Sequence, residues 1–157
     1  MHKYEAILAG QPFFMGINLR YLRLICKSAS DVAFDAGEFL FHQGEKADRF
    51  YLVRRGRVAL EVFTPERGVI TIETISDGGV LGASCFFPPY LWHFEAQAIE
   101  RTHAMVFDTE SLRRRFEDDP RLGFYLIERF AHIMTQRLKA MQMQLVDLYA
   151  DPLSTIR

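Results

Sequence analysis

Two stretches of the sequence decide the fold, FDAGEFLFHQGE at residues 34–45 and FYLVRRGRV at residues 50–58. In both, apolar residues alternate with other residues between glycines, which is the pattern of short strands joined by tight turns. The same period of two continues on either side, from about Ser30 to Asp108. Many short strands without intervening helices predict an antiparallel sandwich or barrel rather than a parallel α/β sheet.

Helical spacing replaces this alternation toward the N-terminus. Asn18 is a predicted N-cap for a helix with an apolar stripe at residues 21–26. The apolar residues 12–14 are expected to pack as a plug against the rest of the chain. We therefore expect residues 1–29 to form an N-terminal helical segment.

Two helices are predicted after the strands. The first covers about residues 109–117, and Pro120 then suits the first turn of a second, longer helix. Residues 30–108 are accordingly assigned to the β-structure and residues 109–149 to the C-terminal helices. Together with the N-terminal segment they are expected to form one domain, residues 1–157.

The long helix carries an apolar row whose later members step by 4, 3, 4 and 3 residues, the spacing of a coiled-coil seam. These members are Met134, Leu138, Met141, Leu145 and Leu148. A helix over residues 121–149 is about 43 Å long at 1.5 Å per residue, which exceeds the expected width of the β-structure. We therefore predict a homodimer that buries this seam. The alternative, in which the row packs on its own chain, fits Ile127 to Met134 better than the distal part.

Composition describes an ordinary globular protein, with 49% hydrophobic residues, 25% charged residues and a formal net charge of -1. Such a balance provides no electrostatic field for nucleic acid or an anionic membrane. No signal peptide is recognised, and the uncharged run at residues 78–94 is too short and too interrupted to span a bilayer. Cys26 and Cys85 lack CxxC spacing and are expected to be buried free thiols. We predict a cytoplasmic protein.

The stretches at residues 34–45 and 50–58 resemble the cyclic-nucleotide-binding domain family. That family includes catabolite-activator-type bacterial regulators, protein kinase A regulatory subunits and gated channels. The match extends over about residues 13–148, and five glycines fall at the family's turns: Gly37, Gly44, Gly56, Gly79 and Gly82. The resemblance implies a mainly β fold with flanking helices. This fold is a β-roll of the double-stranded β-helix or jelly-roll type with a long C-terminal helix.

The resemblance also implies a phosphate-binding cassette. In the family, a Gly-Glu pair opens a short helix, and an arginine follows about ten residues later in an Arg-x-Ala-x-Val-x-Ala strand. Backbone N–H groups and the arginine hold the cyclic phosphate, while the glutamate binds the ribose 2′-OH. Here Ala83 occupies the glutamate position, and Trp92 occupies the arginine position, or His93 if the loop slips by one residue. No other arginine lies between Arg67 and Arg101.

Losing these contacts predicts weak or absent binding of cAMP and cGMP. A charge-assisted contact contributes about 1.5–3 kcal/mol, so the missing contacts weaken binding by roughly two decades or more. The residues that would line the altered ligand site are Gly82, Ala83, Ser84, Cys85, Trp92 and His93.

Two interpretations of this altered cassette stay open. In the first, the site is reshaped for a more apolar or planar ligand, with Trp92 stacking and His93 as a polar handle. In the second, Trp92 and its neighbours fill the pocket, and the domain is a ligand-free interaction scaffold that presents the aromatic loop Phe86 to Phe94 to a partner.

No catalytic or metal-binding pattern is visible. No two of the five histidines stand two residues apart, and Ser84 lies outside a GxSxG motif, so we predict neither an enzyme nor a metal site. His42 is expected at the surface or in a hydrogen bond. Only eight residues follow Tyr149, too few for a helix-turn-helix, so DNA binding is not expected either.

The sequence thus predicts a regulatory, signal-transducing module. It is expected to be a stand-alone homodimer that acts on an unidentified protein partner. We expect no cofactor, apart from a cyclic nucleotide or another small ligand in the altered site. The alternative is the ligand-free dimeric scaffold.

Overall fold

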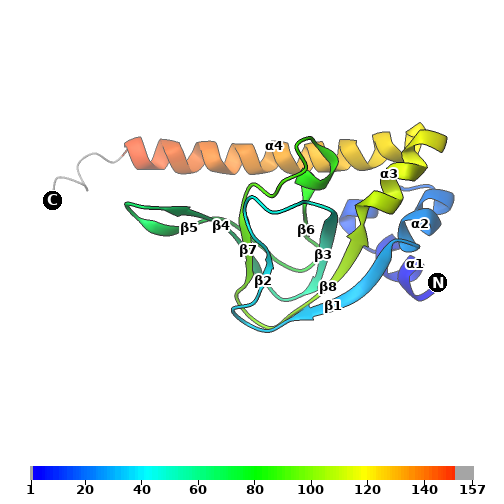
Figure 1. Cartoon of the computed structure of the whole chain (residues 1–157), viewed down its shortest axis with the longest axis horizontal. Coiled ribbons are helices and arrows are strands. Elements are labelled where there is room, and N and C mark those ends of the chain that lie inside the picture. The colour runs from blue at the N-terminus through cyan, green and yellow to red at the C-terminus, as the bar shows by residue number, and fades with distance from the viewer. Residues whose placement is uncertain (1, 151–157) are drawn as a thin grey trace.

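Two antiparallel sheets of four strands each form the β-roll that the sequence predicts (Figure 1). The computed structural model describes residues 2–150. The strand order is β1-β8-β3-β6 in one sheet and β2-β7-β4-β5 in the other. The strands are β1 Ala29–Phe34, β2 Phe39–Phe41, β3 Arg49–Arg55, β4 Val58–Thr64, β5 Gly68–Ile75, β6 Val80–Leu81, β7 Glu95–Ala98 and β8 Thr102–Asp108.

Helices cover one end of the roll and one of its sides (Figure 1). The α-helices are α1 His2–Ala9, α2 Leu19–Cys26, α3 Thr109–Asp118 and α4 Pro120–Ala150, and the 3₁₀ helices are η1 Pro12–Phe14 and η2 Ala83–Phe86. The predicted N-cap is confirmed, because Asn18 Oδ1 accepts a hydrogen bond of 2.8 Å from the backbone N–H of Arg20. Two further predictions are confirmed: α4 begins at Pro120, and Phe13 and Phe14 are buried.

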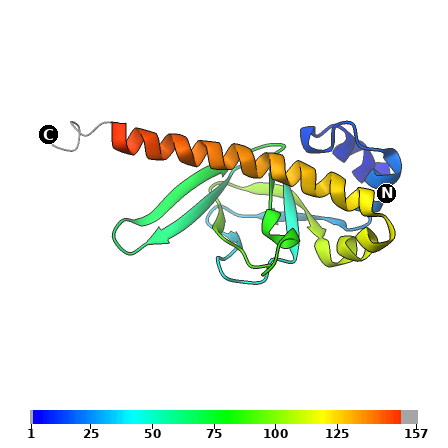
Figure 2. The same ribbon diagram turned by 90° about the horizontal axis from the view of Figure 1, so that it is seen from above.

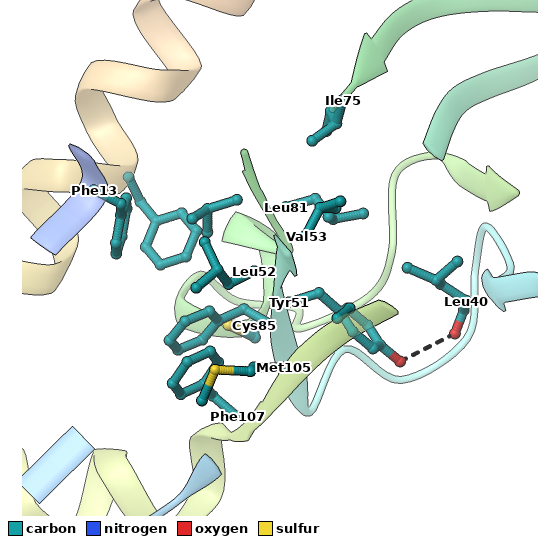
Figure 3. Packing of buried hydrophobic residues seen from close by; sticks show 14 of the residues in the cluster. Phe13, Leu40, Tyr51, Leu52, Val53, Ile75, Leu81, Cys85, Met105 and Phe107 are labelled. Carbon is teal, nitrogen blue, oxygen red and sulfur yellow. Dashed lines mark hydrogen bonds between the residues drawn. The ribbon is translucent and has the colours of Figure 1, made fainter. Parts of the chain in front are cut away.

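A cluster of aromatic rings joins α4 to the roll. Phe130 of α4 lies 5.1 Å from Phe13, 5.2 Å from Phe50 and 5.3 Å from Phe86, measured between ring centroids. Phe50 in turn stacks on Phe107 at 4.4 Å. Figure 3 shows the adjoining part of the core, where Phe13 and Phe107 lie on either side of Leu52, Cys85 and Met105. The proximal half of α4 is therefore anchored by one inserted ring.

The face of α4 that packs on the roll differs from the predicted row. Its buried residues are Leu122, Gly123, Leu126, Phe130 and Arg137. Of the predicted row, only Phe130 is fully buried, while Ile127 and Met134 are more than one third exposed. The row was predicted to pair with a second chain, so its exposure does not contradict that prediction. The alternative, in which the row packs on its own chain, holds fully only at Phe130.

The distal half of α4 has a neighbour that the sequence did not indicate. The β4–β5 hairpin extends beside it (Figures 1 and 2). The side chains of Arg137 and Glu73 form an ion pair, and Gln144 Nε2 donates to the carbonyl of Ile72 at 3.3 Å. Both contacts are polar, so the apolar seam residues Leu138, Leu145 and Leu148 remain more than half exposed.

Smaller expectations are also met. Cys26 and Cys85 are buried free thiols, and His42 Nδ1 lies 2.9 Å from Glu95 Oε2. None of the helices among residues 2–150 is both long and apolar enough to pass through a membrane.

Replacing Phe130 with alanine tests the aromatic anchor. Phe130 is 0% exposed, so Phe130→Ala should lower the free energy of unfolding by about 3–5 kcal/mol in a urea titration. The matched control is Phe124→Ala on the same helix, where a side chain 68% exposed should cost no more than about 0.5 kcal/mol. Equal effects of the two substitutions would contradict the anchor.

Candidate functional site

The turn into the cassette can be made only by glycine. Gly82 follows β6 with φ +119° and forms the N-cap of η2. A Cβ atom at this position would lie 2.8 Å from the Cα of Phe50, which is closer than real Cβ contacts allow. The missing side chain thus lets the cassette backbone lie directly on β3, and η2 presents Ala83 and Ser84 to the interior of the site.

The segment of the cassette around Trp92, which leads into β7, is held by backbone hydrogen bonds to the loop after β2. The N–H of Trp92 donates to the carbonyl of Glu45, and the N–H of Gly44 donates to the carbonyl of Trp92, both at 2.9 Å. The indole of Trp92 is buried and stacks on the ring of Phe41, with centroids 3.8 Å apart and planes 10° apart. On the side of Trp92, the wall of the site is therefore a pair of stacked rings.

An arginine does lie beside this wall, and each of its three side-chain nitrogens already has an acceptor. Arg49 sits over the Trp92 ring at 5.6 Å. Its guanidinium donates to Tyr51 Oη at 2.6 Å, to Asp48 Oδ1 at 2.7 Å and to the carbonyl of Leu40 at 2.9 Å. Arg49 therefore braces the wall and does not take the role of the missing cassette arginine.

Tyr51 completes this braced wall. Burial raises the pKa of its phenol, so the group stays protonated and donates to the carbonyl of Leu40 at 3.3 Å (Figure 3). The carbonyl of Leu40 thus accepts from both Arg49 and Tyr51.

A cavity of about 240 Å³ lies between the cassette and α4. It is lined by Phe41, Leu60, Leu81, Gly82, Ala83, Ser84, Phe87, Trp92, His93, Phe94, Met134, Arg137, Leu138 and Met141. The lining thus combines the β-roll and the C-terminal helix, which are far apart in the sequence. A molecule in this cavity would touch both.

Five of the six sequence-predicted ligand residues line this cavity, and Cys85 does not. The Cys85 side chain is fully buried behind η2, and burial raises the pKa of its thiol, which keeps it protonated and unreactive. Trp92 faces inward in phase with Ala96 and Ala98, whereas the His93 side chain is exposed at the margin. Trp92 is thus the residue on the inward side of this segment.

The sequence missed the contribution of α4 to this site. Met134, Leu138 and Met141 line the cavity, although their spacing predicted only a dimer seam. Arg137 also lines it, with its side chain nine-tenths buried. One signal was present: Arg137 stands seven residues after Phe130, on the same side of the helix, where a charge is unexpected.

The family comparison agrees with this geometry. The sequence model described as "Cyclic nucleotide-binding domain" matches residues 31–119. The chain belongs to this family. A "CRP-like cAMP-activated global transcriptional regulator" from Mycobacterium tuberculosis is 27% identical over 146 residues, which cover 92% of the chain and 62% of that relative. The chain therefore spans less than two thirds of the length of this relative.

Solved structures show the same fold. A putative cyclic nucleotide-binding protein from Geobacter metallireducens superposes with a TM-score of 0.77 at 24% identity, covering 88% of this chain and 99% of that one. The catabolite activator protein of Thermus thermophilus gives a TM-score of 0.69 at 20% identity, covering 87% of this chain and 62% of that one. The predicted β-roll with a long C-terminal helix is thereby confirmed.

The residues present do not fit the ligand contacts that the family resemblance implies. Ala83 offers no acceptor to a ribose hydroxyl, and the indole of Trp92 provides a ring face where a phosphate needs a guanidinium. The neighbouring Arg49 already has three acceptors. Within residues 2–150, no three His, Cys, Asp or Glu side chains gather as a metal ion would require.

Two glycine substitutions test the close contact of the cassette with β3. Gly37 also has a positive φ, +92°, but a Cβ there would meet nothing within 4 Å. Gly37→Ala should lower the free energy of unfolding by about 1–2 kcal/mol, because alanine is strained at this positive φ. Gly82→Ala should lower the free energy of unfolding by at least about 1 kcal/mol more than Gly37→Ala does, because Phe50 must also be displaced. Equal losses in chemical denaturation would show that Gly82 is needed only for its φ.

Proposed function

We propose that this chain is a ligand-responsive regulatory module of the cyclic nucleotide-binding domain family whose own ligand is not cAMP or cGMP. The observation that carries the proposal is the cavity between the cassette and α4. Sealing of the altered site by Trp92 would have favoured a ligand-free scaffold. Instead the indole lies flat against Phe41 and leaves space beside Gly82 to Ser84.

The proposed response is a shift of α4. Ligand contacts at the cassette and at Met134 and Leu138 connect the β-roll to the helix, so occupancy favours one position of α4 over another. Phe130 holds the proximal half in the aromatic cluster. The distal half meets the hairpin through the polar contacts of Arg137 and Gln144, so it is the part with least resistance to movement.

The exposed seam supports a second copy of the chain as the first partner. Apolar side chains at the spacing of a coiled coil stabilise a helix pair by burying one another. We propose a homodimer through this seam that acts on a further protein.

The scaffold alternative has less support. It requires the aromatic loop to face a partner, yet Phe86 and Trp92 are buried in the chain itself. The loop exposes Pro88, Pro89 and Leu91 instead. A thermal-shift screen of nucleotides and small metabolites separates the two functions, because a ligand that binds only the folded chain raises the unfolding midpoint, with the logarithm of its concentration relative to Kd. A screen without any binder would support the scaffold.

Calorimetry with cAMP and cGMP tests the altered cassette. Without a glutamate and an arginine, affinity should be at least about 100-fold lower than that of a cAMP-activated relative assayed in parallel. The regulator from Mycobacterium tuberculosis is a suitable positive control. Sub-micromolar binding of either nucleotide to this chain would refute the expectation.

Light scattering tests the seam. The wild-type chain should be a dimer at micromolar concentration, and Leu145→Asp should convert it to a monomer by placing a charge in the apolar interface. Val146→Asp is the matched control, because Val146 is 58% exposed, against 55% for Leu145, but lies outside the 4-3 spacing. A monomeric wild-type chain, or equal effects of both substitutions, would exclude the seam as the interface.

A further inference from the structure

Arg137 is the one charged residue in the lining of the cavity. It projects from α4, is nine-tenths buried, and donates from Nε to Glu73 Oε2. Its Nη2 atom is also buried but has no hydrogen-bond partner within the described part of the chain. A buried donor without a partner costs free energy, and the cost is larger for a charged group. Nη2 is closed off from the cavity as well as from solvent, and the Glu73 side of Arg137 lines a second cavity. A ligand acceptor in the first cavity would remove this cost when the guanidinium turns toward it.

The rest of the lining favours an apolar, planar molecule. Phe41, Phe87, Trp92 and Phe94 contribute rings, and the other polar side chains are Ser84 and His93. A volume of about 240 Å³ holds roughly eight water molecules at about 30 Å³ each, so the ligand has on the order of ten non-hydrogen atoms in the cavity. The site is therefore small, mostly apolar and provided with one cationic group.

We propose that the cavity binds a small monocarboxylic acid with an aromatic body. The carboxylate pairs with the guanidinium of Arg137, and the ring packs among the aromatic side chains around Trp92. This inference rests on the proposed function, since it specifies the ligand of the same cavity. In an aromatic carboxylic acid the polar atoms are two oxygens at one end of the molecule. In a ribose phosphate the polar atoms lie over the whole molecule, and most of them would have no hydrogen-bond partner in this lining.

Glu73 orients the guanidinium and also opposes the ligand. By accepting from Nε it holds the arginine side chain in place. Its negative charge lies beside the same guanidinium and so disfavours a second anion there. Neutralising Glu73 and neutralising Arg137 should therefore change the affinity for an acid in opposite directions. A purely structural ion pair would instead give two losses.

The probes are 3-phenylpropanoate and its amide, 3-phenylpropanamide, which share their shape and differ in charge. Trp92 is the single tryptophan of the chain and lines the cavity, so its fluorescence reports binding without a label. The wild-type chain should bind the acid at least tenfold more tightly than the amide. Arg137→Gln should weaken acid binding about 10- to 100-fold and leave amide binding unchanged. Glu73→Gln should strengthen acid binding.

Each contrary outcome overturns a defined part of the proposal. Failure of both probes to bind at millimolar concentration excludes this ligand class, whereas the thermal-shift screen decides separately whether the cavity binds anything. Equal binding of acid and amide, unchanged in Arg137→Gln, excludes the anion contact and leaves a ligand cavity. If Arg137→Gln and Glu73→Gln both weaken acid binding, the ion pair between Arg137 and Glu73 has only a structural role. If Arg137→Gln does not fold, Arg137→Lys is used in its place. This variant should lower the affinity for the acid less than tenfold, because lysine keeps the positive charge but lacks the planar guanidinium.

Discussion

The insertion of Phe130 into the aromatic cluster is the contact on which the rest of the molecule depends. Its ring meets Phe13 of the N-terminal segment, Phe50 of the roll and Phe86 of the cassette helix. Because aromatic rings bury large areas and prefer defined angles, Phe130 sets where α4 crosses the roll together with the buried Leu122 and Leu126. The position of the cavity, and of Arg137 within it, follows from that crossing.

The cassette shows how a ligand site can keep its backbone and change its chemistry. Gly82 preserves the sharp entry into η2, and the bonds between Trp92 and the loop at Gly44 and Glu45 preserve the return. Between them the charged contacts of the family are replaced by stacked rings, with Arg49 committed to the wall. In the site that we propose, the cation comes from the helix, the same element that is proposed to respond to the ligand.

Much of the fold could be predicted from the sequence, because it depends on local patterns. The strand alternation, the cap at Asn18 and the start of α4 at Pro120 each have a short-range physical cause. The inward face of α4 could not be predicted, since its apolar residues lie on nearly all sides and only Phe130 shows which face packs. For Arg137 the one local signal was a charge seven residues after Phe130, whereas its pairing with Glu73, 64 positions away, has no local signal.

The length of α4 beyond Phe130 gives the helix the mechanics of a lever. Twenty residues separate Phe130 from the helix end at Ala150, which is about 30 Å at 1.5 Å per residue. A tilt of about 5° about the aromatic pivot displaces the far end by roughly 2.6 Å, nearly the length of a hydrogen bond. The cavity lies along the part of this arm from Met134 to Met141, and the exposed seam continues to Leu148. A sub-ångström adjustment around a small ligand is therefore amplified where two chains would meet.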